Sequence, residues 1–183
     1  MPVNKLPPIL EFHTCSDLTQ TDVLDTLFEP SPAIHATLIP VIRTAVYSTW
    51  SDLIDACQIR LLSLATSTST SSPDPTLLSV LGSHPRLGEK RITSEQSAAE
   101  QANLQGDGSK DSSAEAEELA RLNQEYEAAF PGLRYVVFVN GRGRREIMDD
   151  MRARIARADY TKEVDAALQA MCDIAKDRAS KLE

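Results

Sequence analysis

The sequence predicts an all-α protein, folded as a single-domain helical bundle. Its 183 residues are enough for one hydrophobic core, and no internal repeat divides residues 1–183 into separate units. Aromatic residues make up only 5% of the chain, and many leucines and alanines favour helices over strands. Apolar residues also recur at helical spacing through most of the chain, and residues 135–139 are the one strongly apolar, β-branched run.

Three helices are expected before residue 66. The first covers about residues 21–28, and Ser31 followed by Pro32 has the pattern of an N-cap with proline at the first helical position. Pro40 is expected to interrupt the helix that starts there, because proline lacks the backbone N–H. The third is an amphipathic helix of about five turns, marked by apolar residues at helical spacing: Val46, Trp50, Leu53, Cys57, Leu61 and Leu64.

The middle of the chain has two predicted loop insertions, at residues 66–75 and 106–111. The first is rich in serine and threonine, and a short helix is expected to follow it from Thr76. The second follows a helix that residue 93 or 94 is expected to cap and that runs to about residue 105.

The capping box Ser112-x-x-Glu115 is expected to open the next helix, whose apolar face consists of Leu119, Leu122, Tyr126 and Phe130. Residues 135–139 have no comparable second run to pair with, so they are expected to form a buried extended segment or a helix start. Two further helices follow. Their apolar residues are Ile147, Met151 and Ile155 in one, and Val164, Leu168, Met171 and Ala175 in the other.

The composition disfavours several classes of protein. A formal net charge of −8 and a pI near 4.9 argue against binding to nucleic acid or to an anionic membrane. No apolar run approaches the ~18 residues of a membrane span, and no secretory signal is recognised. Cys15, Cys57 and Cys172 stand far apart without a CxxC pair, so neither a disulfide framework nor a metal site is expected.

These features predict an intracellular protein. Ser180-Lys181-Leu182 has the form of a peroxisomal targeting signal, which is read at the end of a chain. Glu183 follows it in this sequence, so the expected location is cytoplasmic or peroxisomal.

His84 is the first candidate for chemistry. It follows Gly82, where a helix is expected to end, and precedes Pro85, which disfavours a helical backbone at His84. The imidazole is therefore expected to project from a stiff turn, where a histidine that titrates near ~6.5 can transfer protons at neutral pH. The alternative is an exposed loop histidine without a role.

Three polar residues share one face of the helix expected to begin near Ser94. Ser97, Glu100 and Gln101 fall on the same face as Leu104, which suggests that polar groups point into an apolar pocket. The alternative is that Ser97 and Glu100 form a capping box and only mark the start of the helix.

Arg178 continues the apolar stripe of the last helix, so its guanidinium is expected on the inward face. It can complement the helix C-terminus, reach a buried carboxylate, or bind an anionic substrate with its bidentate fork. A second basic group, Arg142, Arg144 and Arg145, is expected to be a solvated turn, given the net negative charge of the chain.

Taken together, these residues resemble the 2-oxo-4-hydroxy-4-carboxy-5-ureidoimidazoline (OHCU) decarboxylase family of urate breakdown. The resemblance covers about residues 23–178. Six matching segments occur in the family's order: Leu27-Phe28-Glu29-x-Ser31-Pro32, His84-Pro85-x-Leu87, Ser97-x-x-Glu100-Gln101, Leu122-Asn123-x-x-Tyr126, residues 130–139, and Ile174-Ala175-x-x-Arg178. Each motif is weak alone, but six in this order are specific.

The resemblance implies a helical bundle that needs no metal or organic cofactor and converts OHCU into (S)-allantoin and carbon dioxide. It makes His84 the acid/base histidine and Glu100 the second catalytic residue. The other positions that it carries over are expected to bind substrate: Pro85, Ser97, Gln101, Leu133, Arg134, Tyr135, Val136, Val137 and Arg178.

The expected partner is a small-molecule substrate, and a homodimer is compatible with this assignment. Two alternatives stay open. One is a divergent homologue that acts on another ureido or imidazole compound. The other is a non-catalytic helical module that binds a basic partner through its acidic face.

Overall fold

The computed structural model describes residues 4–66, 74–88, 95–102 and 110–183. Within these residues the chain forms nine helices and no β-strand, which confirms the all-α, single-domain class. In chain order the helices are α1 (Ile9–Phe12), α2 (Asp17–Phe28), α3 (Pro32–Thr44), α4 (Trp50–Ala65), α5 (Pro75–Leu81), α6 (Glu95–Ala102), α7 (Lys110–Ala129), α8 (Arg144–Arg157) and α9 (Tyr160–Leu182).

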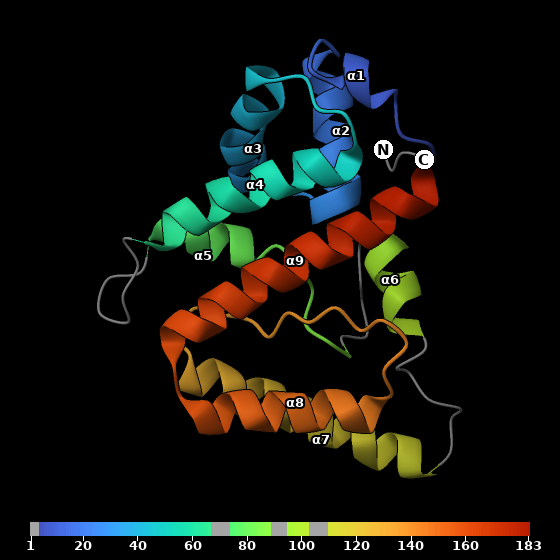
Figure 1. The fold of residues 1–183 in the computed structure, drawn as a ribbon. Helices are drawn as coiled ribbons and strands as arrows, with labels where there is room; N and C mark the ends of the chain where they lie inside the picture. The colour runs from blue at the N-terminus through green and yellow to red at the C-terminus, as the bar shows by residue number, and fades with distance from the viewer. Residues whose placement is uncertain (1–3, 67–73, 89–94, 103–109) are drawn as a thin grey trace.

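Helix α9 is the central element of the fold (Figure 1). It packs against α4 and α2, and α3 and α5 complete the layer on that side. Helices α7 and α8 pack against each other and form a second layer. Residues 133–139 have neither helix nor strand structure and run as an extended segment between α8 and α9, while α6 lies beside the C-terminal part of α9 (Figure 1).

One hydrophobic core joins the two layers, and its burial is the main source of stability. The apolar stripe predicted for the last helix is confirmed, because Val164, Leu168, Met171 and Ala175 are all buried in α9. Residues 133–139 also contribute to the core. Leu133, Tyr135 and Val136 are buried and residues 137–139 are half-buried, so the extended form predicted for residues 135–139 is confirmed, and its burial is confirmed for Tyr135 and Val136.

Side-chain caps explain where several helices begin. Ser31 Oγ accepts the N–H of Ile34 at 3.4 Å, and Pro32 is the first residue of α3, as predicted. Helix α4 begins with a capping box between Thr49 and Asp52.

The prediction that Pro40 interrupts a helix is wrong, because α3 continues through Pro40 to Thr44. Proline cannot donate a hydrogen bond to the carbonyl four residues earlier, which here is that of Ala36. Both Pro40 and Ala36 are exposed, so water can satisfy that carbonyl and the helix tolerates the proline.

Three predicted helix starts are also wrong. Helix α2 begins at Asp17 because Ser16 caps it, four residues before the predicted start. Helix α4 begins at Trp50, and Val46 precedes it with 58% of its surface exposed. Helix α7 begins at Lys110, before Ser112, so the predicted capping box does not mark its first turn.

The predicted loop insertions at 66–75 and 106–111 fall mostly outside the described residues, as does the predicted helix end near residue 105. None of the helices in the described ranges is long and apolar enough to cross a membrane. Ser180, Lys181 and Leu182 belong to α9, and the carbonyl of Leu182 accepts the N–H of Leu6 at 3.0 Å.

We expect Pro40→Ala to stabilise the protein by roughly 1–3 kcal/mol, because alanine restores the backbone donor and removes the steric clash of an interior helical proline. Denaturant unfolding followed by circular dichroism measures the change. Pro32→Ala is the matched control, since proline is favourable in the first turn and its removal should not stabilise. A Pro40→Ala protein less stable than wild type contradicts the explanation.

Candidate active site

A cavity of about 300 Å³ lies where four parts of the chain meet. They are the loop after α5, helix α6, the extended segment with the turn that follows it, and the C-terminal part of α9. The lining residues are His84, Pro85, Leu87, Ser97, Ala99, Glu100, Gln101, Tyr135, Val136, Val137, Phe138, Val139, Asn140, Gly141, Ile174, Asp177 and Lys181. Most of the residues predicted for the site therefore surround one cavity.

Distant side chains hold the loop that carries His84. Arg134 Nη1 donates to the carbonyls of Gly82, at 2.9 Å, and of His84, at 3.3 Å. Asn123 Nδ2, from α7, donates to the carbonyl of Leu87 at 3.0 Å. A loop without regular structure is thus fixed through its own backbone carbonyls.

Gln101 and Gly88 close the end of the same loop. Gln101 Oε1 accepts the N–H of Gly88 at 2.8 Å. Gly88 has a φ of +79°, which favours glycine, and a Cβ there would lie 2.8 Å from Leu119 Cδ2 and would displace that side chain. Gln101 lines the cavity as predicted, and its amide also holds the loop in place.

His84 is buried, with 5% of its surface exposed, so the alternative of an exposed loop histidine is wrong. Its Nε2 has no hydrogen-bond partner among the described residues. Burial and the positive charge of Arg178 lower the pKa of His84 to about 4, and the carboxylate of Glu29 opposes this shift. The resting imidazole is therefore neutral at neutral pH, and the expectation of titration near 6.5 is wrong.

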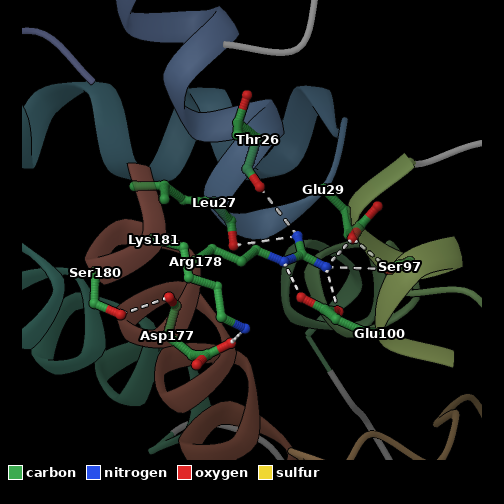
Figure 2. A network of polar contacts seen from close by, with 9 residues as sticks. All are labelled: Thr26, Leu27, Glu29, Ser97, Glu100, Asp177, Arg178, Ser180 and Lys181. Carbon is green, nitrogen blue, oxygen red and sulfur yellow. Dashed lines mark hydrogen bonds and ion pairs between the residues drawn. The ribbon is translucent and has the colours of Figure 1, made fainter. Parts of the chain in front are cut away.

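Arg178 lies at the centre of a buried ionic cluster beside the cavity (Figure 2). Its Nε donates to Glu100 Oε1 at 2.7 Å and its Nη2 donates to Glu100 Oε2 at 2.9 Å, a bidentate pair. Nη2 also donates to Glu29 Oε1 at 2.7 Å. Nη1 donates to the carbonyls of Thr26 and Leu27 at 3.1 and 3.4 Å. Three roles were open for Arg178: to complement the helix C-terminus, to reach a buried carboxylate, or to bind an anionic substrate. The structure shows the second, because its guanidinium binds the buried carboxylate of Glu29.

Glu29 is the member of this cluster to which the sequence assigned no role. It directly follows α2 with φ 82° and ψ 148°, a backbone conformation that side chains other than glycine rarely adopt. Ser97 Oγ donates to its Oε1 at 2.6 Å. Burial alone would raise the pKa of Glu29, but Arg178 and Ser97 together hold that pKa below its usual range.

Glu100 is the part of the cluster that reaches the cavity. Its side chain is 27% exposed, whereas that of Glu29 is 2% exposed. Two carboxylates share one guanidinium, so the cluster carries one net negative charge beside the neutral His84. Ser97 lies inside α6, which begins at Glu95, so Ser97 does not cap this helix and the capping-box alternative is wrong.

Three residues predicted to bind substrate do not line the cavity. Leu133 is 1% exposed and belongs to the core, Arg134 holds the His84 loop, and Arg178 lies behind Glu100. Conversely, Phe138, Val139, Asn140 and Gly141 line the cavity although the sequence did not single them out.

Helix α9 adds Ile174, Asp177 and Lys181 to the lining. They stand near Arg178 at helical spacing, so the periodicity of this helix is the signal that could have found them. In the described ranges, no group of three or more His, Cys, Asp or Glu side chains is arranged to hold a metal ion.

We expect Arg178→Met to destabilise the protein by roughly 3–5 kcal/mol at pH 7, because the buried carboxylate of Glu29 and the partly buried carboxylate of Glu100 would lose their shared counter-ion. Without Arg178, the pKa of Glu29 should rise above its usual value, so the destabilisation should shrink as the pH falls towards 4 and the carboxylate takes up a proton. Unfolding free energies of both proteins from pH 7 to 4 test this. A loss that does not depend on pH would contradict the ionic explanation.

A second pH effect should come from His84. Its folded pKa, near 4, lies below its unfolded value of about 6.5, so its contribution to stability is complete above pH 6.5 and is lost as the pH falls to 4. Between pH 7 and 4.5, wild type should lose on the order of 2 kcal/mol more stability than His84→Asn. Parallel pH profiles of the two proteins would show that His84 is not kept neutral by the fold.

Comparison with known proteins gives one family match. The model of the OHCU decarboxylase family matches residues 13–180, which include every residue that lines the cavity except Lys181. A comparison with curated proteins gives no significant match. Because the family model spans nearly all of the chain, the protein belongs to the OHCU decarboxylase family and is a carboxy-lyase of urate degradation.

Proposed function

We propose that this protein converts OHCU into (S)-allantoin and carbon dioxide in the cavity beside Arg178, with no metal or organic cofactor. The observation that carries the proposal is His84, a buried histidine that lines the cavity and whose Nε2 is without a hydrogen-bond partner among the described residues. A buried polar atom without a partner is costly in a folded protein, which favours a role with a ligand.

The substrate itself can accept the electrons of this reaction. When the bond between the ring carbon and the carboxylate breaks, carbon dioxide leaves and its electron pair forms a C=C bond with the ureido-bearing carbon. The electrons of the adjacent C=N bond pass to the ring nitrogen, which takes up a proton from water. The hydroxyl-bearing carbon is then part of an enol. Transfer of the hydroxyl proton to the neighbouring ureido-bearing carbon gives the carbonyl and the stereocentre of (S)-allantoin. The protein has to orient the substrate and transfer protons to one face.

A neutral His84 suits this sequence of steps. It can accept the hydroxyl proton while the enol forms and return it as an imidazolium to the ureido-bearing carbon. The low pKa of His84, about 4, makes the imidazolium a strong acid and favours the return of the proton. Within the cluster, the carboxylate of Glu29 favours the imidazolium, but the positive charge of Arg178 disfavours it more, so His84 readily gives the proton back.

Glu100 is proposed to hold the substrate. Its carboxylate is fixed by two hydrogen bonds from Arg178 and presents acceptor oxygens to the cavity. The hydroxyl and the ureido N–H groups of OHCU are donors that match it. Arg178 then acts through Glu100 and does not contact the substrate.

The test uses freshly prepared OHCU. Wild type should accelerate its decay and the appearance of the circular-dichroism signal of (S)-allantoin, together with carbon dioxide. His84→Asn should lose roughly 100-fold or more of the rate, as expected for removal of a general acid–base group. His35→Asn is the control, because His35 pairs with Asp25 and does not line the cavity.

Two outcomes would refute the proposal. Equal rates for His84→Asn and wild type would remove His84 from the chemistry. Absence of OHCU turnover by wild type, with carbon dioxide released from another ureido or imidazole acid, would make the protein a divergent member of the family.

A further inference from the structure

Lys181 is the one cation among the described residues that line the cavity, because His84 is neutral there. It follows Ile174 and Asp177 on one face of α9, at helical spacing. Its Nζ donates to Asp177 Oδ2 at 2.5 Å, and Figure 2 shows this pair on α9 separate from the Arg178 cluster. An ammonium group has three donors, and Asp177 is its sole acceptor in the described part of the chain. Two donors are therefore available to a ligand.

Three arginines lie close to the cavity, but they bind protein acceptors and do not line it. Arg178 binds two carboxylates and two backbone carbonyls, and Arg134 binds two carbonyls of the loop after α5. Arg142 Nη2 donates to Phe138 O at 2.5 Å, and its Nε donates to Val139 O at 3.3 Å. The expectation of a solvated turn is therefore wrong for Arg142, and Lys181 is left as the cation that a ligand in the cavity can reach.

The other charges of the cavity wall are negative. Glu100 and Asp177 both line it, each with 27% of its side chain exposed. The whole chain carries a formal net charge of −8, so its field repels an anionic ligand. The side chain of Lys181 is 65% exposed, which places this positive charge at the mouth of the cavity, in reach of a ligand that arrives from solvent.

We propose that Lys181 is a substrate-binding residue at this mouth, where its ammonium group binds the carboxylate of the substrate. The inference rests on the proposed function for the identity of that substrate. OHCU has one carboxylate, together with the hydroxyl and ureido donors that suit Glu100, so one molecule complements both side chains. A cavity of about 300 Å³ suits a compound of this size.

The contact with Lys181 is strongest before the reaction. As carbon dioxide forms, the negative charge of the carboxylate passes into the ring, and carbon dioxide itself is neutral. Lys181 therefore binds the substrate at least as well as the transition state, so it contributes to KM and not to kcat. Allantoin has no carboxylate, so the same lysine does not hold the product back.

Lys181→Met is the principal test, because methionine keeps the apolar stem and removes the charge. We expect KM for OHCU to rise about 10-fold, with kcat within about 3-fold of wild type. Lys181→Arg, which keeps the charge, should retain most of the affinity. Lys176→Met is the control, because Lys176 lies on the same helix, pairs with Asp55 and does not line the cavity.

Two further measurements distinguish a contact with the carboxylate from a structural effect. The inhibition constant of allantoin should be the same for wild type and Lys181→Met, and so should the melting temperature, because exposed ion pairs contribute little to stability. The difference in KM between the two proteins should narrow as salt is added. An unchanged KM would overturn the proposal, and so would a loss of allantoin affinity as large as the rise in KM.

A binding measurement without turnover separates this proposal from the proposed function. Hydantoin-5-acetate and allantoin are both 5-substituted hydantoins, and the first alone has a carboxylate. In isothermal titration calorimetry, Lys181→Met should weaken the binding of hydantoin-5-acetate about 10-fold and leave that of allantoin unchanged. Failure of OHCU turnover with this difference intact would refute the substrate alone. Equal binding of hydantoin-5-acetate to both proteins would refute the role of Lys181, and so would no binding to wild type.

Discussion

The buried ion cluster around Arg178 is the interaction on which the candidate site depends. It joins α9 to the end of α2 through Glu29 and to α6 through Glu100, so three segments that are far apart in sequence converge on one guanidinium. Burying the charges of Arg178 and Glu29 is costly, and the cost is offset only when every donor has a good acceptor. Here Nε, Nη1 and Nη2 all donate, to two carboxylates, a hydroxyl and two backbone carbonyls.

The cluster also sets the electrostatic state of the cavity. With two carboxylates and one guanidinium, it keeps a net negative charge next to a histidine that burial holds in its neutral form. Burial and the positive charge of Arg178 disfavour the imidazolium more than Glu29 favours it, so a proton that His84 takes up is readily returned. Arg178 therefore serves the cavity without lining it, and Glu100 is the carboxylate that faces a ligand.

The walls of the cavity are irregular backbone, and polar side chains replace the regular hydrogen bonds that such backbone lacks. Arg134, Asn123 and Gln101 hold the loop that carries His84. Arg154 and Arg142 hold the extended segment on the opposite wall. In each case the side chain comes from a helix or turn outside the segment that it fixes. This arrangement fixes the segments although they have no regular hydrogen-bond pattern of their own.

The sequence by itself determined the helical class, the helices with a clear apolar stripe and the candidate residues His84, Ser97, Glu100 and Gln101, because helical periodicity and capping are local properties. It also determined the start of α3 at Ser31 and Pro32. Only the tertiary structure decided the partners of Arg178, the role of Glu29 and the backbone carbonyls that Arg142 binds. The partners of Arg178 are up to 152 positions away in sequence, and backbone carbonyls carry no sequence signal. Solvent exposure, which only the tertiary structure shows, also explains why α3 continues through Pro40. The carbonyl of Ala36, which proline leaves without an N–H donor, lies at an exposed residue where water can bind it.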